Sequence, residues 1–309
     1  MSTQLEGYGI DINNIVVWSK DYDYYSHLDP KYYRDELSEQ YRLVFGREMN
    51  WETPKTYNEI INWEKLNLHD SRRTNLADKV RVKEYIKEKI GEEYLNNLIG
   101  QGIYDDVDQI NFDNLPNAFV IKMNNGSGKN IIIKDKSKAN IDEIRRTLRD
   151  WSKINYAYCN GTYEMHYHDI VPKIICEEYL QGVAEDVCDY DVYCFHGEPK
   201  YIHCVRGCHT DSWRGAFYDT EWKRQPFSHG CPEDNEPADR PPQLEKMLEL
   251  SRKLSEGFDH VRIDWWDLPD GRLLFCEMTF SSWAGFSPFK PDKYDLFFGM
   301  LITNPQKVV

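Results

Sequence analysis

Three β-hairpins constrain the fold more than any other feature of the sequence. Residues 117–138 contain two apolar runs on either side of a Gly-Ser-Gly turn, and residues 189–206 reverse direction at His196-Gly197. A third pair of strands, residues 260–280, turns at Pro269-Asp270-Gly271. Short turns of this kind join antiparallel neighbours, whereas parallel strands need long crossovers. The pattern therefore predicts an α+β chain with antiparallel hairpins rather than repeated βαβ units.

The rest of the chain is mostly helical in pattern. The segment after Glu36 has helical spacing and ends at Gly46, and a second segment has cap-like Thr53 with Pro54 in its first turn. A third amphipathic segment closes at Gly91, and a helix capped by Asn140 follows the first hairpin. We expect four regions, namely an irregular leader over 1–35, a helical N-terminal region over 36–115, a small lobe over 116–185 and a large lobe over 186–309.

Charge and hydropathy exclude two classes of partner. The 309 residues include 52 acidic and 38 basic side chains, for a net charge of −14. A nucleic-acid-binding protein needs a basic surface to displace counterions, so we expect no nucleic-acid partner. No apolar run approaches the about 18 residues of a membrane-spanning helix. The N-terminus lacks the basic and apolar segments of a signal peptide, so we expect a cytoplasmic protein with no transmembrane segment.

All eight cysteines lie in the second half of the chain, and none forms a C-x-x-C pair. Structural zinc needs four convergent ligands, usually in closely spaced pairs. Only Cys204 and Cys208 have such spacing, so we expect reduced thiols and keep zinc as the alternative. The locally Cys/His-rich stretch consists of His196, His203, Cys204, Cys208, His209, His229 and Cys231.

The first motif with chemical meaning is Gly126-Ser127-Gly128, between the strands of the first hairpin. Glycines let backbone amides approach an anion closely, and Lys122 and Lys129 add positive charge on either side. The motif therefore predicts a loop that covers phosphate groups. A tight hairpin turn without a ligand is the alternative interpretation.

The second motif is the pair of carboxylates on the last hairpin. The turn folds the two strands together, so that Asp264 and Glu277 can lie side by side and hold Mg²⁺. Arg262 is two residues before Asp264 and so lies on the same strand face, where it can reach a phosphoryl group. A surface hairpin with exposed acids is the alternative. Lys79 and the Glu177-Glu178 pair are weaker signals, because solvated lysines and strand-edge acids are common.

The order of these motifs resembles the ATP-grasp superfamily of carboxylate–amine ligases. The strings TPKTYNE (53–59) and CFHGEPK (194–200) are more specific. With the segments 76–95, 173–180 and 261–280, they resemble the TupA-like ATP-grasp family, which is associated with teichuronopeptide and other bacterial surface polysaccharides. The resemblance covers roughly residues 36–290. It implies an ATP-grasp fold, in which two α+β lobes grip ATP.

The resemblance also implies roles for single residues, with ATP and Mg²⁺ as cofactors. Lys79 and Lys122 would contact the phosphates, and the Gly126-Ser127-Gly128 loop would close over them. The adenine would meet a hinge made of Glu177, Glu178, Tyr179 and Leu180, and Asp189 would hold the ribose. Asp264, Glu277 and Thr279 would hold the metal, and Arg262 would lie near the acyl phosphate.

Two residues depart from the family pattern. Thr279 stands where most ATP-grasp enzymes have a metal-binding Asn, and Asp191 stands where this family is commonly basic. Charge for the γ-phosphate would then come from Lys200, Arg206 or Arg214, so Arg206 and Arg214 join Arg262 as predicted catalytic residues.

The implied reaction joins an amine to a carboxylate through an acyl phosphate. The carboxylate would belong to a small molecule or glycan, such as a uronic acid in polysaccharide synthesis. One alternative is a metal-dependent glycosyltransferase, because Asp21-Tyr22-Asp23 and Asp189-Tyr190-Asp191 both read as D-x-D. Another is a non-catalytic nucleotide-binding protein, which the two departures would explain.

Overall fold

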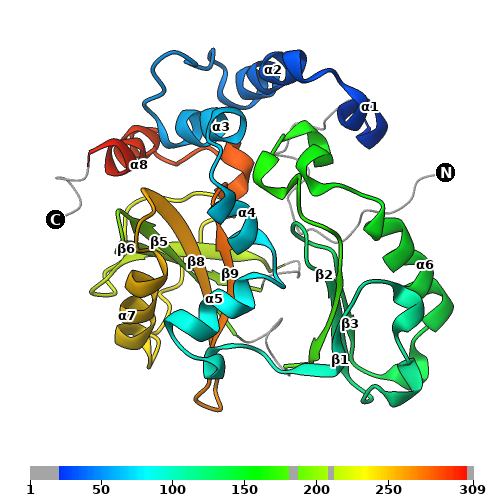
Figure 1. Ribbon diagram of the computed structural model, residues 1–309. Coiled ribbons are helices and arrows are strands. Elements are labelled where there is room, and N and C mark those ends of the chain that lie inside the picture. Colours follow the sequence, from blue (N-terminus) through cyan, green and yellow to red (C-terminus); the bar gives the residue numbers. More distant parts are fainter. Residues whose placement is uncertain (1–20, 181–186, 208–211, 305–309) are drawn as a thin grey trace.

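The computed structural model describes residues 21–180, 187–207 and 212–304. It contains two antiparallel sheets that form separate lobes (Figure 1). The four-stranded sheet has the order β1-β4-β2-β3, and the five-stranded sheet has the order β7-β6-β5-β8-β9. The α+β class and all three predicted hairpins are confirmed. The strands are β1 (Leu98–Tyr104), β2 (Phe119–Met123), β3 (Asn130–Ile133), β4 (Ile174–Glu178), β5 (Asp189–Phe195), β6 (Glu198–Arg206), β7 (Arg214–Asp219), β8 (His260–Asp267) and β9 (Leu273–Thr279).

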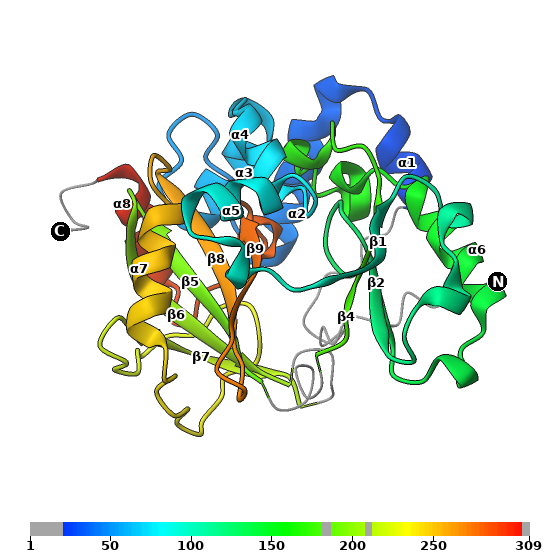
Figure 2. The ribbon, with the colours of Figure 1, turned by 60° about the horizontal axis from the view of Figure 1, so that its bottom comes forward.

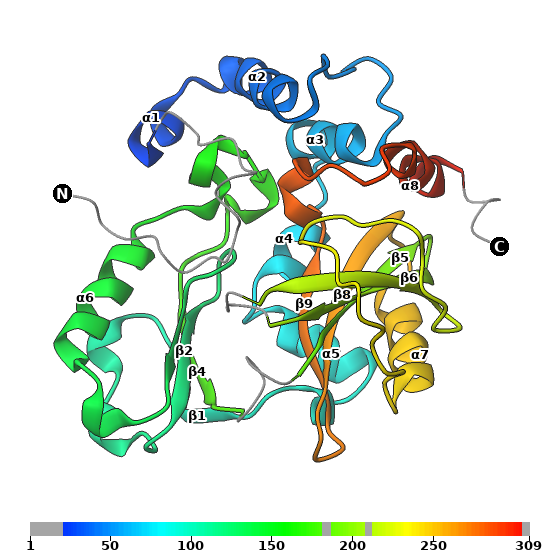
Figure 3. The same ribbon diagram turned by 180° about the vertical axis from the view of Figure 1, so that it is seen from behind.

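Helices cover the outer faces of the sheets and one edge of both lobes (Figures 1 and 3). The α-helices are α1 (Tyr22–His27), α2 (Tyr33–Phe45), α3 (Tyr57–Asn67), α4 (Ser71–Ala77), α5 (Val82–Lys89), α6 (Ile141–Ser152), α7 (Leu244–Leu254) and α8 (Lys293–Thr303). Short 3₁₀ helices are η1 (Pro30–Tyr32), η2 (Glu92–Tyr94), η3 (Val107–Gln109), η4 (Phe112–Asn114), η5 (Lys136–Lys138), η6 (Tyr156–Gly161), η7 (Met165–Tyr167) and η8 (Ser282–Gly285). Among the described residues, no helix combines the length and the apolar character that crossing a membrane requires.

The small lobe buries one face of its sheet under α6. Phe119 and Ile121 on β2 pack with Ile144 and Leu148 of that helix. Since side chains alternate along a strand, Lys122 points to the opposite face, and so does Glu177 on β4. This second face therefore turns its polar groups toward the other lobe.

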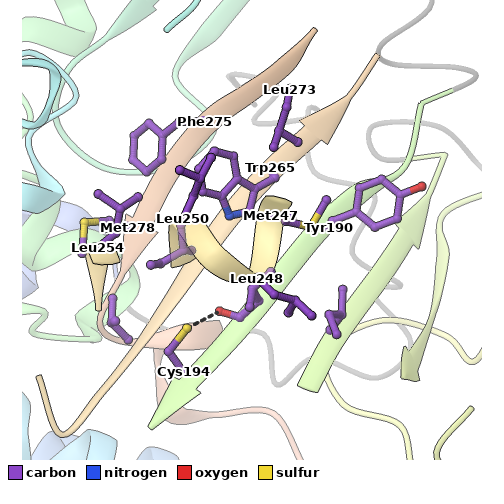
Figure 4. Close-up of a cluster of buried hydrophobic side chains, with 14 of the residues drawn as sticks. Tyr190, Cys194, Met247, Leu248, Leu250, Leu254, Trp265, Leu273, Phe275 and Met278 are labelled. Carbon is purple, nitrogen blue, oxygen red and sulfur yellow. Dashed lines mark hydrogen bonds between the residues drawn. The ribbon is translucent and has the colours of Figure 1, made fainter. Parts of the chain in front are cut away.

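The large lobe is built in the same way, with α7 on the apolar face of the five-stranded sheet. Figure 4 shows Met247, Leu250 and Leu254 of this helix packed over Trp265 and Met278 of the sheet. The indole of Trp265 donates a hydrogen bond to Ser251 Oγ at 2.9 Å. Helix α5 joins the same core and lies beside β8 and β9 (Figure 2), so the N-terminal helices are not an independent unit.

Several expectations for the N-terminal third need correction. Residues 21–35 are not irregular, because Asp21 caps α1 by accepting from the backbone N–H of Tyr24 at 3.0 Å, and α2 begins at Tyr33. The Asp21-Tyr22-Asp23 sequence is thus a helix start rather than a metal site. Thr56 and not Thr53 caps α3, through a capping box with Glu59. Residues 1–20 lie outside the described part of the chain.

The predicted helical region over 36–115 also contains a strand. Residues 98–104 form β1, which pairs with β4 in the small lobe. Gly100 and Gly102 weaken the strand pattern in the sequence, and the pairing partner is about 75 residues away, so no local signal marks it. The helix predicted over 77–91 is shorter in the structure, where α5 begins at Val82 after a turn at Asp78.

The α7–sheet core yields a stability prediction. Leu250 is 1% exposed, so Leu250→Ala removes buried methyl groups and leaves a cavity under the helix. We expect the free energy of unfolding to fall by about 2–5 kcal/mol, measured by urea denaturation. Leu43→Ala on α2, where the side chain is 49% exposed, is the matched control and should change it by less than about 0.5 kcal/mol. Equal effects of both substitutions would contradict this assignment of the core.

Candidate active site

Acidic side chains form a row across the polar face of the five-stranded sheet. Strand register places Glu277 of β9 opposite Asp264 of β8, and Asp264 opposite Asp191 of β5. The row continues to His203 on β6. The hairpin therefore brings Asp264 and Glu277 side by side, as the sequence predicts. Asp191, the departure from the family pattern, lies directly beside them.

Arg262 is the cation shared by this row. Its guanidinium donates to both oxygens of Asp264, at 2.7 Å from Nε and 2.5 Å from Nη2. The same Nη2 donates to Glu277 Oε1 at 3.4 Å and to Thr279 Oγ1 at 3.2 Å. Thr279 in turn donates to Glu277 Oε1 at 3.1 Å. The four predicted residues of the hairpin thus form one connected group.

Lys79 adds a second cation and connects this group to the glycine-rich loop. Its Nζ lies 3.0 Å from Glu277 Oε2 and donates to the carbonyl oxygen of Gly126 at 2.8 Å. The turn that carries Lys79 is held by Asp78, which accepts from the backbone N–H of Val80 and from the Asn124 amide at 2.9 Å. Asn124 is fully buried and precedes the loop, so the turn and the loop are fixed together.

The pKa values of Asp264 and Glu277, the predicted metal ligands, shift in opposite directions. Burial by itself raises the pKa of Glu277, but Lys79 and Arg262 outweigh it and lower that pKa to about 2. Burial raises the pKa of Asp264 well above its usual value; Arg262 opposes the rise, and the neighbouring Asp191 adds to it. The two cations therefore keep Glu277 ionised, whereas burial and the neighbouring Asp191 favour the protonated form of Asp264.

Paired carboxylates are the oxygen ligands that Mg²⁺ prefers, and Thr279 adds a hydroxyl. In the part of the chain that the structure describes, no three His, Cys, Asp or Glu side chains are placed to hold a metal by themselves. Such a site fits Mg²⁺ that takes its remaining ligands from water and from nucleotide phosphates.

A second charged cluster lies on the inner face of the small lobe. Lys122 Nζ lies 2.6 Å from Glu177 Oε2, and Lys83 Nζ lies 2.8 Å from Glu177 Oε1. Burial would raise the pKa of Glu177, but the two lysines lower it to about 2. Sequence reasoning missed Lys83, because it lies in the first turn of α5 and its partner Glu177 is on β4, far away in the sequence.

The predicted hinge lies at the end of β4. The backbone N–H of Glu178 donates to Asn97 O at 2.9 Å, and its carboxylate accepts from the Asn97 amide at 2.8 Å. Tyr179 is half-buried and Leu180 is buried against Leu274 of the large lobe. Asp189, at the start of β5, accepts a hydrogen bond from the indole of Trp266. It shares a strand face with Asp191, which is consistent with its predicted place near the nucleotide.

The glycine-rich loop has the predicted backbone freedom but only part of the predicted charge. Gly126 has φ +82°, and a Cβ there would lie 2.1 Å from the Tyr156 ring, so only glycine fits. Ser127 is exposed and Gly128 also has positive φ. Lys129 points away from the loop and donates to the carbonyl oxygen of Ile154 at 3.2 Å. It therefore anchors the end of the α6 region rather than facing a phosphate.

Arg206 and Arg214 lie at a different place in the large lobe from Arg262. Both bind the buried carboxylate of Asp234: Arg206 through a charged hydrogen bond and Arg214 with Nε at 3.3 Å. Pleat alternation puts them on the sheet face opposite Asp191. Their predicted contact with the γ-phosphate stays a prediction.

The Cys/His-rich stretch does not form a zinc site among the described residues. His203 lies 3.5 Å from both Cys231 Sγ and Asp191 Oδ2, but no further Cys or His completes a ligand set. The seven described cysteines are free, while Cys208 and His209 lie outside the described residues.

The lysine pair on Glu177 yields a prediction of pH-dependent stability. Because its pKa is lowered from 4.5 to about 2, the stabilisation is complete above pH 4.5 and is lost as the pH falls toward 2. We expect Glu177→Gln to cost about 3 kcal/mol at pH 7, and this difference from wild type to shrink between pH 4.5 and pH 2 in urea denaturation. Glu178→Gln, at a half-exposed side chain, should cost less than about 1 kcal/mol. A Glu177→Gln difference that does not vary with pH would contradict the assignment.

Solved structures similar to this chain share little sequence with it. The D-alanine–D-alanine ligase from Bacillus anthracis complexed with ATP is 16% identical, with TM-score 0.39, over 67% of this chain and 55% of that chain. The L-amino acid ligase from Bacillus licheniformis is 12% identical, with TM-score 0.43, over 74% and 49%. The ATP-grasp ligase PsnB, complexed with minimal precursor, Mg and ADP, is 10% identical, with TM-score 0.36, over 72% and 58%. The chain spans about half the length of these proteins.

Comparison with curated protein sequences gives no match. The model of the TupA-like ATP-grasp family matches residues 59–303, from the capping box of α3 to the end of α8. The match contains both sheets and every residue of the acidic row and its cations, and it extends past residue 290, where the resemblance in sequence ended. The chain therefore belongs to the TupA-like ATP-grasp family.

Proposed function

We propose that the protein is an ATP-dependent carboxylate–amine ligase that forms an amide through an acyl phosphate. One observation carries the proposal. In a chain of the ATP-grasp family, Lys79 and Arg262 converge on the paired carboxylates Asp264 and Glu277, beside the glycine-rich loop. Cations next to paired carboxylates suit phosphoryl transfer, where positioning and charge stabilisation do most of the work.

In this reaction a substrate carboxylate oxygen attacks the γ-phosphorus of ATP, and the bond to the ADP oxygen breaks. An amine then attacks the acyl carbon, forms the C–N bond and displaces phosphate. Lys79 and Lys122 orient the phosphates, and Arg262 stabilises the negative oxygen of the tetrahedral intermediate. Asp264, Glu277 and Thr279 would hold Mg²⁺, which when bound neutralises phosphate charge.

The remaining predicted residues complete the nucleotide site. Residues 177–180 would meet the adenine between the lobes, and Asp189 would bind the ribose hydroxyls. Arg206 and Arg214 would have to leave Asp234 to reach the γ-phosphate. Because Asp234 is buried and its pKa is lowered by Arg206 against the effect of burial, that exchange would be costly, and Lys79 and Arg262 are the better candidates.

The family resemblance supports a uronic acid or another glycan carboxylate as acceptor and an amino acid as amine, in a cytoplasmic step of surface-polysaccharide synthesis. A screen tests this proposal directly. The protein is incubated with MgATP, hydroxylamine or amino acids, and D-glucuronate, D-galacturonate or their UDP-linked forms. ADP release is measured, and mass spectrometry identifies hydroxamates or amides. Release of nucleoside diphosphate from the UDP-sugar instead would indicate a glycosyltransferase, and MgATP binding without turnover a non-catalytic protein.

The metal carboxylates yield a prediction about activity. We expect Asp264→Asn and Glu277→Gln each to lower ADP release by at least about 100-fold, because each removes a charge that positions Mg²⁺ beside the phosphates. Asp267→Asn is the matched control, since Asp267 is on the same strand but accepts from Gln243 outside the acidic row. Unchanged ADP release in both of the first two variants would reject the metal assignment.

A further inference from the structure

Two tryptophans from opposite edges of the five-stranded sheet are in contact. Trp213 directly precedes β7, and Trp283 lies in η8, just after β9. These strands are the two edges of the sheet, yet the ring centres are 5.6 Å apart, with the ring planes at 46°. Both side chains are half-buried, so part of each indole faces solvent. We call these two residues the tryptophan pair.

The tryptophan pair lies on the face of the sheet that carries the acidic row. The indole of Trp283 packs on Gly230, where a Cβ would lie 2.2 Å from the ring. The next residue, Cys231, has its Sγ 3.5 Å from Nε2 of His203, which ends the row on β6. Side-chain alternation along β7, counted from the residue opposite His203, places Trp213 on this same face. The pair therefore adjoins the β6 end of the acidic row.

The backbone conformation and a neighbouring loop hold Trp283 in this place. Trp283 has φ +54° and Ala284 has φ +51°, in the left-handed region that residues other than glycine rarely adopt. Such residues persist only where surrounding contacts hold them, and they cluster at binding sites. The loop backbone at Gly230 packs directly on the indole, and its N–H donates to Ser287 Oγ at 3.0 Å. The ring of Trp283 is therefore held in position without a ligand.

Trp283 and the predicted adenine site lie at opposite ends of β9. Leu274, near the start of the strand, packs with Leu180 of the predicted hinge. Glu277 lies further along the strand, and Trp283 follows the end of the strand. The chain therefore places the predicted metal ligand between the hinge contact and the tryptophan. A substrate whose carboxylate reaches the γ-phosphate beside Glu277 would extend toward the tryptophan pair rather than toward the hinge.

A pyranose ring suits an aromatic surface of this kind. Its hydroxyl groups project around the rim, while C–H bonds project from its two faces and carry a slight positive charge. The face of an indole is apolar and electron-rich, so it attracts such C–H bonds and leaves the hydroxyl groups free for water or polar side chains. Two indoles inclined at 46° can contact a face and an edge of the same sugar ring.

We propose that the tryptophan pair binds the sugar ring of the acceptor, a pyranose that carries the reacting carboxylate. This inference rests on the proposed function, because it assigns the residues that select a ring-shaped acid over an open-chain acid in that reaction. Stacking on the ring is the same before and during the chemical step, since the ring itself does not react. The pair therefore lowers the KM of the acceptor and has little effect on kcat.

The test measures KM and kcat for ADP release with MgATP, hydroxylamine, and either a uronate of the screen or D-gluconate, an open-chain sugar acid. We expect wild type to use at least one uronate with a KM about tenfold below its KM for D-gluconate. Trp213→Ala should raise the uronate KM about tenfold, keep kcat within about threefold, and leave the KM values of MgATP and D-gluconate within about twofold. Trp213→Phe keeps an aromatic face and should restore most of the uronate KM.

Trp222→Ala is the matched control in the same lobe. Trp222 stacks on Tyr218, with ring centres 4.2 Å apart, in the core on the opposite face of the sheet. Its loss should leave every KM unchanged, even where it lowers the temperature of thermal unfolding. Saturation-transfer NMR adds a measurement without turnover. Irradiation of the aromatic protons of the protein should saturate the ring protons of the uronate in wild type and not in Trp213→Ala.

The outcomes separate the sugar site from the ligase activity. An unchanged uronate KM in Trp213→Ala, an equal rise in the KM for D-gluconate, or no saturation transfer to any uronate in wild type would overturn this inference, while continued ADP release would show that the ligase function stands. Absence of ADP release from wild type with every carboxylate, with saturation transfer to a uronate still observed, would reject the proposed ligase function and leave the sugar site.

Discussion

The pairing of Lys79 with Glu277 is the interaction on which the site depends most. Glu277 is partly withdrawn from water, with 29% of its side chain exposed, and a cation in contact stabilises a carboxylate in such a place. That cation stands on a turn held by Asp78 and Asn124, and it also binds the carbonyl of Gly126. One lysine thus connects the N-terminal helices, the loop of the small lobe and strand β9 of the large lobe.

The same rule applies to two further carboxylates, Glu177 and Glu164. Glu177 is buried because Lys83 and Lys122 bind its two oxygens, and Glu164 is buried opposite Lys65. The pKa values of Glu177 and Glu164 differ because the number of neighbouring cations differs. With two lysines in direct contact Glu177 has a low pKa, whereas Glu164 has one more distant lysine and a raised pKa. Nearly equal burial therefore goes with a lowered pKa at Glu177 and a raised pKa at Glu164.

Local sequence patterns predicted the parts of the fold whose contacts join residues close together in the sequence. The hairpin of β8 and β9 followed from its turn, and with it the juxtaposition of Asp264 and Glu277. By contrast, β1 pairs with a strand about 75 residues away in the sequence. The charge partners of Lys83 and Glu164 also lie on other elements, so the sequence near each residue does not reveal them. Periodicity carries no information about such pairs. The same limit applies to Arg206 and Arg214. Both bind Asp234 in the structure, and no pattern in the sequence marks Asp234 as their partner.

Asp191 shows how position changes the interpretation of a substitution. As a departure from a basic residue, it suggested a weakened phosphate site. In the structure it extends the acidic row beside Asp264, and its charge adds to the raised pKa of that carboxyl group. Side by side on neighbouring strands, Asp191 and Asp264 are like charges, and each such neighbour favours the protonated form of a carboxyl group. The acid at position 191 therefore favours a proton on its neighbour rather than simply adding one more negative charge to the row.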